Sequence, residues 1–404
     1  MNILYVSQYF SFKPKHAAAV TTYEIVKKLA EKGHKVTICV PNASSDEITS
    51  AERVSLRIHV YALTHFPSHI VQNSNLLNFF TLTLWYFFLF IWVLKQARKE
   101  KFGIVISMYH STHIATPSAF VMSRVLKIPL IVKEHDLVPW FTDPNKLRRI
   151  YSKIITSISV PLLRRSSQVL VLSDERERIA QKVYGINKQK LSIFPNGVDI
   201  QRFRPYIESE LSKTLGVEDN KILLYSGMIS EDRGLDNLIR ILPIVVANVP
   251  KMKLLIIGDG PEKAKILRSA IDLKVDGFVD FIGSVEHSSV NRFISLADVT
   301  IGPLRSSIAH ETSYPLKVLE YMACAKPVVA FTRSVSSDLI ISGYNGVLVP
   351  DGEVDELASA IVKLMNNKKL ADEIGRNARK SVEKVHDWNR LINKLDRLIR
   401  AEDV

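Results

Sequence analysis

Short apolar runs of strand length alternate with segments of helical periodicity along almost the whole chain, and this alternation restricts the possible folds most. In the first half the strand-like runs are NILYVS (2–7), HKVTICV (34–40), GIVISM (103–108), PLIVKE (129–134) and QVLVLS (168–173). In the second half they are KILLYSG (221–227), KLLIIGDG (253–260), VDFIGSV (279–285), DVTIGP (298–303), PVVAF (327–331) and GVLVP (346–350). Strands that alternate with helices form parallel sheets covered on both faces. The pattern therefore predicts an α/β protein.

The two series of strands are separated by FPNGVDIQRFRP, residues 194–205, where Pro, Asn and Gly cluster. A chain of 404 residues also exceeds one core of ordinary size. We therefore expect two Rossmann-like domains, over residues 1–198 and 199–387. Such sheets bind ligands at the carboxyl ends of their strands, so two facing domains would enclose a cleft lined by those loops.

The charge of the chain is unevenly distributed. The net charge is +13, and residues 1–200 hold 26 Lys and Arg against 13 Asp and Glu, while the rest holds 28 against 28. A basic half suits nucleic acid, an anionic membrane or an acidic substrate. We find no nucleic-acid-binding motif, and the basic residues do not alternate with aromatic ones. Cys39 and Cys324 lie in apolar runs, which predicts neither a disulfide nor a metal site and suits a reducing compartment.

The most apolar segment is LLNFFTLTLWYFFLFIWVL, Leu76 to Leu94, and Lys95, Arg98, Lys99 and Lys101 follow it. As a helix its 19 residues would extend about 28 Å, close to a bilayer core. Strands of one expected sheet lie on both sides of it, which argues against a transmembrane span. The open alternatives are a span, a buried helix, and a helix in the membrane interface with Trp85 and Trp92 at the polar boundary; the interfacial helix is favoured. The N-terminus shows no signal-peptide pattern.

Three features of the second domain predict an anion site. Gly227 and Gly258 each follow a strand, where a backbone can approach a ligand closely, although a tight turn is the ordinary reason for such a glycine. Pro315 suits the first position of a helix. The amides of the next residues, Leu316, Lys317 and Val318, would then lack helical partners and favour a phosphate. Arg233 could add a guanidinium, or be an ordinary surface arginine.

Glu320 stands in an apolar run that includes Val318, Leu319, Tyr321 and Met322, so its helix should be largely buried. A buried carboxylate costs several kcal/mol unless charges or hydrogen bonds satisfy it. The two hydroxyls of a ribose beside the phosphate site would satisfy it, and an internal salt bridge is the alternative. These features favour a pocket for a nucleoside diphosphate.

The segments SGMISEDRGLDNLI, IIGDGP, FIGSV, LADVTIGP and PLKVLEYMACAKPVV together resemble the nucleotide-sugar-binding half of family 4 glycosyltransferases, which have the GT-B fold. YVSQYF, EIVKKLAEKGHKVTI and KEHDLVPW are similar, more weakly, to their acceptor domain, and FPNGVD to their interdomain connection. DWNRLINKLDRLI resembles the helix that returns to that domain, here about 388–404. The resemblance implies mostly retaining enzymes that need no metal or cofactor, use UDP- or GDP-linked sugars, and commonly act on lipid-linked acceptors at the cytoplasmic membrane face.

The resemblance also assigns site residues. Arg233 matches the basic residue that binds the diphosphate, Leu316 and Lys317 match amides over the phosphates, and Glu320 matches the ribose-binding glutamate. Val285 matches the residue whose backbone contacts the base, and His135 the histidine that faces the reacting sugar. On the residues alone, His135 beside Asp136 at a strand end is as consistent with a structural role.

Three positions depart from the family pattern. Thr312 stands where the first of two glutamates is usual, and Glu311 lies one residue early, so it serves as a catalytic candidate only if the loop shifts. Met228 replaces an arginine of the diphosphate site. His16 and Ala17 replace the glycine pair of the acceptor-side loop. The sugar, and the way in which it is held, therefore stay open.

The sequence thus predicts a glycosyltransferase, peripheral or monotopic on the cytoplasmic face of a membrane, that contacts anionic lipid through Leu76–Leu94 and the basic N-terminal half. It would transfer a sugar from a nucleotide-diphosphate donor to a lipid-linked glycan acceptor, with no metal. The reaction needs no strong protein base, and His135 is the candidate if one acts. Two alternatives remain: a catalytically silent nucleotide-sugar- or lipid-binding partner, and a GT-B epimerase acting on a UDP-sugar.

Overall fold

The structure is a computed structural model, and it describes residues 1–12, 17–40, 58–61, 76–110, 115–137, 146–302, 304–305, 314–333, 335 and 338–402. Its contacts divide the chain into two compact units. Unit 1 comprises Met1–Pro195 and Trp388–Val404, and unit 2 comprises Asn196–Asp387. The division at Asn196 lies three residues before the boundary expected at residue 199.

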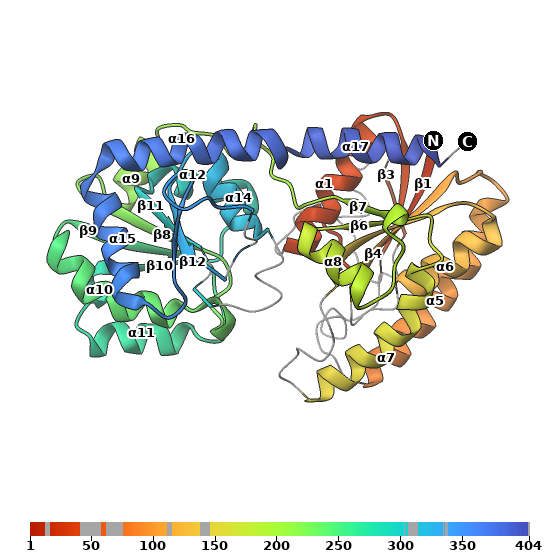
Figure 1. Ribbon diagram of the computed structural model, residues 1–404, viewed down its shortest axis with the longest axis horizontal. Coiled ribbons are helices and arrows are strands. Elements are labelled where there is room, and N and C mark those ends of the chain that lie inside the picture. Colours follow the sequence, from red (N-terminus) through yellow and green to blue (C-terminus); the bar gives the residue numbers. More distant parts are fainter. Residues whose placement is uncertain are drawn as a thin grey trace. The chain divides into compact units, whose positions relative to one another are not determined.

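Unit 1 is built on a parallel sheet in the order β3-β2-β1-β4-β5-β6-β7 (Figure 1). Its strands are β1 (Asn2–Val6), β2 (Lys35–Cys39), β3 (Ile58–Tyr61), β4 (Ile104–His110), β5 (Leu130–Asp136), β6 (Gln168–Val171) and β7 (Leu191–Ile193). The order reverses between β1 and β4, and the carboxyl ends of strands at such a reversal are the usual place of a ligand. The edge strands β3 and β7 were not predicted from the sequence.

Helices cover both faces of this sheet. They are α1 (Ala17–Glu31), α5 (Leu76–Ala97), α6 (Ala115–Leu126), α7 (Lys146–Leu163), α8 (Asp174–Lys182) and α17 (Trp388–Ala401), with the short η2 (Lys188–Lys190). One core lies between the sheet and α5, α6, α7 and α8, and includes Leu4 and Val6 of β1. The other lies against α1 and α17, and includes Ile3 and Tyr5. Alternate residues of β1 thus enter opposite cores, as the pleat of a strand requires.

Unit 2 contains a second parallel sheet, in the order β10-β9-β8-β11-β12-β13. Its strands are β8 (Lys221–Ser226), β9 (Met252–Ile257), β10 (Val279–Gly283), β11 (Val299–Ile301), β12 (Val328–Phe331) and β13 (Val347–Val349). All six were predicted, because continuous Val, Ile and Leu runs are typical of strands buried on both faces. Here the order reverses between β8 and β11.

The helices of unit 2 also form two layers. They are α9 (Ser209–Leu215), α10 (Leu235–Asn248), α11 (Lys263–Asp272), α12 (Val290–Leu296), α14 (Leu316–Ala323), α15 (Val354–Asn366) and α16 (Lys368–Val385), with the short η3 (Glu231–Arg233), η4 (Asp276–Phe278) and η5 (His287–Ser289). One core packs against α10, α11 and α15, and the other against α12, α14 and α16. The predicted burial of α14 is correct, since Val318 to Ala323 are all buried.

Helix α5 contains the apolar segment and extends three residues beyond Leu94. Trp85 is only 1% exposed and packs edge-on against Tyr86, so its expected place at a membrane boundary is wrong. Leu89 and Val93 are also buried, whereas Phe87 is 58% exposed. Helix α5 thus has one face in the core of unit 1 and another facing out. No helix among the described residues combines the length and apolar character that crossing a bilayer requires.

Candidate active site

The loops after β8 and β9 pack closely at the carboxyl edge of unit 2. The amide of Gly227 donates to the carbonyl of Ile257, and that of Gly258 to the carbonyl of Gly283, both at 2.8 Å. Gly258 has a φ of +131°, and a Cβ added there would stand 2.0 Å from the carbonyl oxygen of Gly227. Only glycine permits this approach. The two predicted glycines therefore lie side by side and bring adjacent backbones together.

Helix α14 points its amino end toward the same edge, because it follows β11 beside β8. It begins at Leu316 with Pro315 as its N-cap, one residue later than we expected. The amide of Val318 donates to the carbonyl of Pro315 at 3.0 Å, so the prediction that it would lack a partner is wrong. The amides of Leu316 and Lys317 are left without a helical acceptor, as at any helix start, and are the ones suited to an anion.

The Lys317 side chain reaches the glycine loop. Its Nζ lies 3.9 Å from the centroid of the Tyr225 ring, and 2.9 Å from where a Cβ on Gly227 would stand. Arg233 belongs to η3, in the loop after β8, and its Nε lies 3.2 Å from a carboxylate oxygen of Asp232. Met228 directly follows Gly227 and is 58% exposed. The positive side chains described near the glycine loop are thus Lys317 and Arg233.

Glu320 is 7% exposed and accepts a hydrogen bond from His287 Nε2 at 2.6 Å. Sequence reasoning missed His287, which lies in η5 after β10. Its Nδ1 is 3.5 Å from Arg202 Nη1, and a guanidinium can only donate, so Nδ1 accepts and Nε2 carries the proton toward Glu320. The carboxylate therefore accepts an internal hydrogen bond from a neutral imidazole rather than forming the salt bridge that was our alternative, and that hydrogen bond fixes its orientation.

A second contact secures α14 against the sheet. The backbone amide of Ser226, at the end of β8, donates to Tyr321 Oη at 2.7 Å. Burial raises the pKa of Tyr321, so its hydroxyl stays neutral. Val285 lies between β10 and η5, half-buried against the same core as α14. The described donor-site residues therefore gather on the loops after β8, β9 and β10 and on the first turns of α14.

In unit 1, the carboxyl ends of β1, β4 and β5 bring three rings together. The His135 ring stacks on His110 with centroids 6.0 Å apart, and Tyr9 meets His110 edge-on at 6.3 Å. His135 is half-buried, and His110 and Tyr9 were not predicted. Ala17 is exposed as the first residue of α1. His16, Glu311 and Thr312 lie outside the described residues.

Buried charges hold the end of β5 in place. Glu134, beside His135, accepts the amides of Leu137 and Leu172, each at 2.9 Å, and lies 3.6 Å from the guanidinium of Arg176. It thereby joins the loop after β5 to the end of β6. Burial lowers the pKa of neighbouring Lys133 to about 8. A satisfied buried carboxylate of this kind orders the end of β5, which carries His135.

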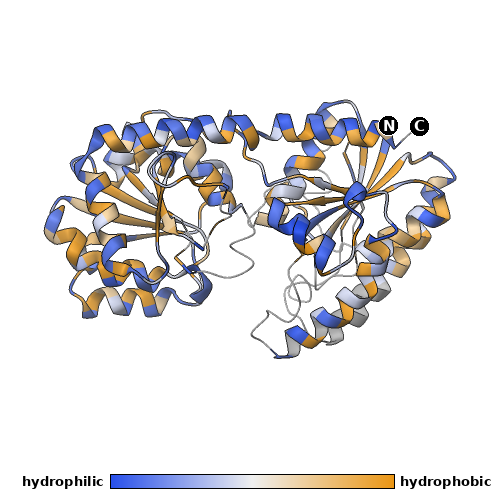
Figure 2. Ribbon diagram, in the orientation of Figure 1, coloured by the Kyte–Doolittle hydropathy of each residue, from blue (hydrophilic) through white to orange (hydrophobic). Residues whose placement is uncertain are grey.

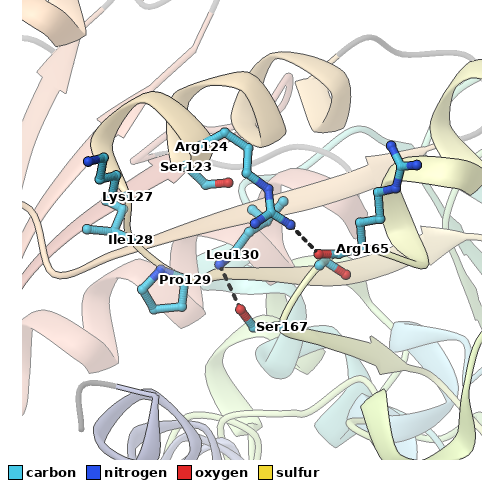
Figure 3. A pocket seen from close by; sticks show the side chains of 9 residues that line it. Ser123, Arg124, Lys127, Ile128, Pro129, Leu130, Arg165 and Ser167 are labelled. Atoms are coloured by element: carbon cyan, nitrogen blue, oxygen red, sulfur yellow. Dashed lines mark hydrogen bonds between the residues drawn. The ribbon is translucent and has the colours of Figure 1, made fainter.

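A hollow of about 360 Å³ lies at the opposite, amino edge of the unit 1 sheet (Figure 3). It is lined by the end of α6 and by Arg165, Ser166 and Ser167 before β6. Arg124 donates to the carbonyl of Arg165 at 2.7 Å, and the side chains of Lys127 and Arg165 point in opposite directions. The positive side chains therefore do not point toward a common ligand position, and Arg124 instead hydrogen-bonds the chain just after α7.

Comparisons with known proteins place the chain in a family. The family described as "Glycosyl transferases group 1" matches residues 207–381, and "Glycosyltransferase Family 4" matches residues 18–202. The chain is 25% identical over 368 residues to the alpha-D-kanosaminyltransferase of Streptomyces kanamyceticus, covering 88% of this chain and 92% of that one. It is 27% identical over 214 residues to a GDP-mannose-dependent phosphatidylinositol monomannoside mannosyltransferase of Corynebacterium glutamicum, covering 52% and 55%.

Solved structures agree in fold. Anabaena HepE, crystallised with UDP, superposes with a TM-score of 0.77 at 19% identity, covering 99% of this chain and 100% of that one. Sucrose-phosphate synthase from Thermosynechococcus elongatus gives a TM-score of 0.74 at 17% identity, covering 99% and 98%. Both sheets of this chain are parallel, as the sequence predicted. The chain belongs to the family 4 glycosyltransferases and has the GT-B fold.

Proposed function

We propose that the protein transfers a sugar from a UDP- or GDP-linked donor to a lipid-linked glycan acceptor, with retention of configuration. The observation that carries this proposal is the edge of unit 2, where the glycine loops, the Lys317 and Arg233 side chains and the Glu320 carboxylate gather. Phosphates suit the loops and the cations, and ribose hydroxyls suit the carboxylate. The names of the relatives support both donor classes, since one uses GDP-mannose and another binds UDP.

In this reaction the bond between the sugar carbon and the diphosphate oxygen breaks, and its electron pair leaves with the nucleoside diphosphate. The acceptor hydroxyl oxygen bonds to the same carbon and loses its proton. Charge develops on the departing diphosphate, so amides and cations aimed at it stabilise the transition state more than the ground state. His135 is our candidate for the group that faces the reacting sugar. We propose that no metal takes part, so activity should survive EDTA.

Binding of UDP, GDP and ADP to the wild type and to Glu320→Gln, measured by calorimetry, tests the donor site. Glutamine keeps the shape of the side chain but removes the charge. We expect one nucleotide to bind, and Glu320→Gln to weaken it about tenfold, or about 1.5 kcal/mol, the contribution of a hydrogen bond to a charged group. Glu286→Gln, which alters an exposed carboxylate near η5, is the matched control and should bind normally.

The outcome also separates the alternatives. If no nucleotide binds to the folded wild type, the proposed donor site is wrong. Binding without transfer to any acceptor in a panel would favour a silent partner protein, and turnover of the donor without an acceptor would favour an epimerase. The anomeric configuration of the product tests retention.

We also propose that unit 1 rests on an anionic membrane surface on the cytoplasmic side. Helix α6 packs against both α5 and α7, and hydrophobic residues recur along all three helices (Figure 2). The exposed apolar residues form what we call the helical face: Phe87, Phe88 and Ile91 of α5, Val121 and Val125 of α6, and Ile150, Ile154 and Ile158 of α7. The spacing in α7 is one residue in four, so its three isoleucines follow one stripe.

Exposed cations accompany the helical face on each helix. They are Lys95, Arg98 and Lys99 at the end of α5, Arg124 and Lys127 at the end of α6, and Lys153 within α7. Apolar side chains beside lysine and arginine are typical of helices that lie in a membrane interface, where the cations contact anionic headgroups. The excess of basic residues in the first half of the sequence supports the same partner.

Co-sedimentation with lipid vesicles tests this surface. We expect the wild type to bind vesicles that contain phosphatidylglycerol, and to be released by salt because headgroup contacts are screened. Ile154→Glu should reduce binding about tenfold, since it places a carboxylate in the apolar stripe. Ile244→Glu on α10 of unit 2 is the matched control, because Ile244 is 44% exposed and Ile154 is 52% exposed. Equal binding by both variants would contradict the proposal.

A further inference from the structure

The Lys317 ammonium is buried without a hydrogen-bond partner among the described residues. Its Nζ is shielded from solvent and lies over the face of the Tyr225 ring, 3.9 Å from the ring centroid. Two other lysines that are buried or partly buried act as hydrogen-bond donors: Lys133 donates to the carbonyl of Glu134, and Lys326 to that of Ser295. Lys317 therefore differs from lysines that serve the fold.

This placement is unfavourable for the free protein. A buried ammonium loses its hydration, and a cation–π contact replaces only part of it. Burial and the positive charge of Arg233 lower the pKa of Lys317 well below its ordinary value, while Asp232 and Glu320 oppose that shift. The groups that face the ammonium are thus Arg233 and Asp232 of η3, Glu320 of α14 and the Tyr225 ring of β8. An apolar side chain would suit the same space better.

The position of the ammonium explains why a lysine is there. It lies 2.9 Å from where a Cβ on Gly227 would stand, at the loop where the two strand ends come together, and it belongs to the first turn of α14. The next residue of that loop, Met228, carries no charge. The positive charges of Lys317 and Arg233 thus repel one another beside the glycine loop. An anion bound there would offset this repulsion.

We propose that the Lys317 ammonium is the principal counter-charge of the donor diphosphate in this chain, held against Tyr225 until the donor binds. The inference rests on the proposed function and adds a role for a side chain where that function used only backbone amides. As the sugar–oxygen bond breaks, the electron pair moves onto the diphosphate, and the protonated Lys317 stabilises it. Because an anion raises the pKa of a neighbouring amine, donor binding should also take up a proton.

Lys317→Met is the test variant, since methionine keeps an unbranched apolar stem and removes the charge. Calorimetry should show that it binds UDP or GDP about 10- to 100-fold more weakly than the wild type does. Affinity for the matching nucleoside, uridine or guanosine, should change less than about twofold, because the ribose partner Glu320 is intact. Thermal unfolding should show that Lys317→Met is at least as stable as the wild type, since a buried charge has been removed.

Lys326→Met is the matched control. Lys326 is also a largely buried lysine of unit 2, but it donates to the Ser295 carbonyl at 2.8 Å, so its loss should lower stability and leave nucleotide affinity unchanged. Proton uptake is measured at pH 8, where the probe phosphates are ionised, in two buffers of different ionisation enthalpy. Because donor binding raises the pKa of Lys317, the wild type should take up more protons than Lys317→Met does.

Two results would overturn the inference alone. One is a Lys317→Met variant that binds UDP and GDP as the wild type does. The other is a variant that is destabilised and loses the nucleoside and the diphosphate equally, which would make Lys317 a structural residue. If the folded wild type binds neither diphosphate, the proposed function fails and the inference fails with it.

Discussion

At the scale of single residues, Glu320 shows how a buried carboxylate is prepared for a ligand. His287 donates to one of its oxygens at 2.6 Å, and Arg202 faces the other nitrogen of the imidazole. This chain of contacts holds Glu320 in one orientation before a ligand arrives. A ribose would then meet an acceptor that loses little conformational entropy on binding.

Replacing His287 should weaken the recognition of ribose. In His287→Phe the carboxylate loses its donor, and we expect KM for the donor to rise about tenfold with a smaller change in kcat. The preference for a ribonucleotide over its 2′-deoxy analogue should fall in parallel. His287→Gln, whose amide can still donate, should recover part of both effects. A purely structural histidine would instead lower stability and leave the 2′-deoxy preference intact.

At the scale of elements, the ends of β8 and β9 depend on two glycines that touch. Gly258 hydrogen-bonds to β10 while its Cα faces the carbonyl of Gly227. The contact leaves backbone rather than side chains on the surface of the loop. That is the property a phosphate site needs.

Gly258→Ala should therefore damage unit 2. The new Cβ would meet the Gly227 oxygen at 2.0 Å and the residue would keep a φ of +131°, so we expect a loss of at least about 2 kcal/mol in the free energy of unfolding. Nucleotide affinity should fall as well. Gly277→Ala is the control, because no atom lies within 4 Å of its added Cβ, and its effect should stay within about 0.5 kcal/mol. Denaturation followed by circular dichroism, and calorimetry, measure the two effects. Equal effects from the two substitutions would contradict the steric argument.

At the scale of the whole molecule, each unit buries an amine at the carboxyl edge of its sheet. Lys317 is an example in unit 2, beside the end of β8, and Lys133 of β5 is an example in unit 1. Lys133 is 1% exposed, beside a Glu134 that is already satisfied by two amides and Arg176. The folded state therefore disfavours the charged form of Lys133, and unfolding takes up a proton at pH values between its folded pKa and the ordinary value of 10.5.

Lys133→Met should stabilise unit 1 in a pH-dependent manner. The folded pKa of about 8 lies below the ordinary 10.5, so the cost of the charged lysine is complete below pH 8 and disappears by pH 10.5. The variant should gain of the order of 3 kcal/mol over the wild type at pH 7 and lose that advantage at pH 10.5. All four tryptophans, 85, 92, 140 and 388, belong to unit 1, so tryptophan fluorescence reports its unfolding. A pH-independent difference would contradict the assignment.

The sequence by itself determined the fold class and most of the strands. Buried parallel strands are continuous apolar runs, and this local signal does not depend on distant residues. The edge strands β3 and β7 escaped prediction because their four- and three-residue runs become strands only by pairing with β2 and β6. The glycines after β8 and β9 were predictable as close backbone approaches, since glycine is a local marker.

Only the tertiary structure decided what the charged and aromatic side chains meet. Glu320 and His287 are 33 residues apart in the chain, and Lys317 reaches the Tyr225 ring from another element. Trp85 and Tyr86 entered the core, although Phe87 of the same apolar run is exposed. The periodicity of apolar residues predicts which side chains are buried. The partner of a side chain depends on which elements the sheets bring together, and that is a property of the packed chain.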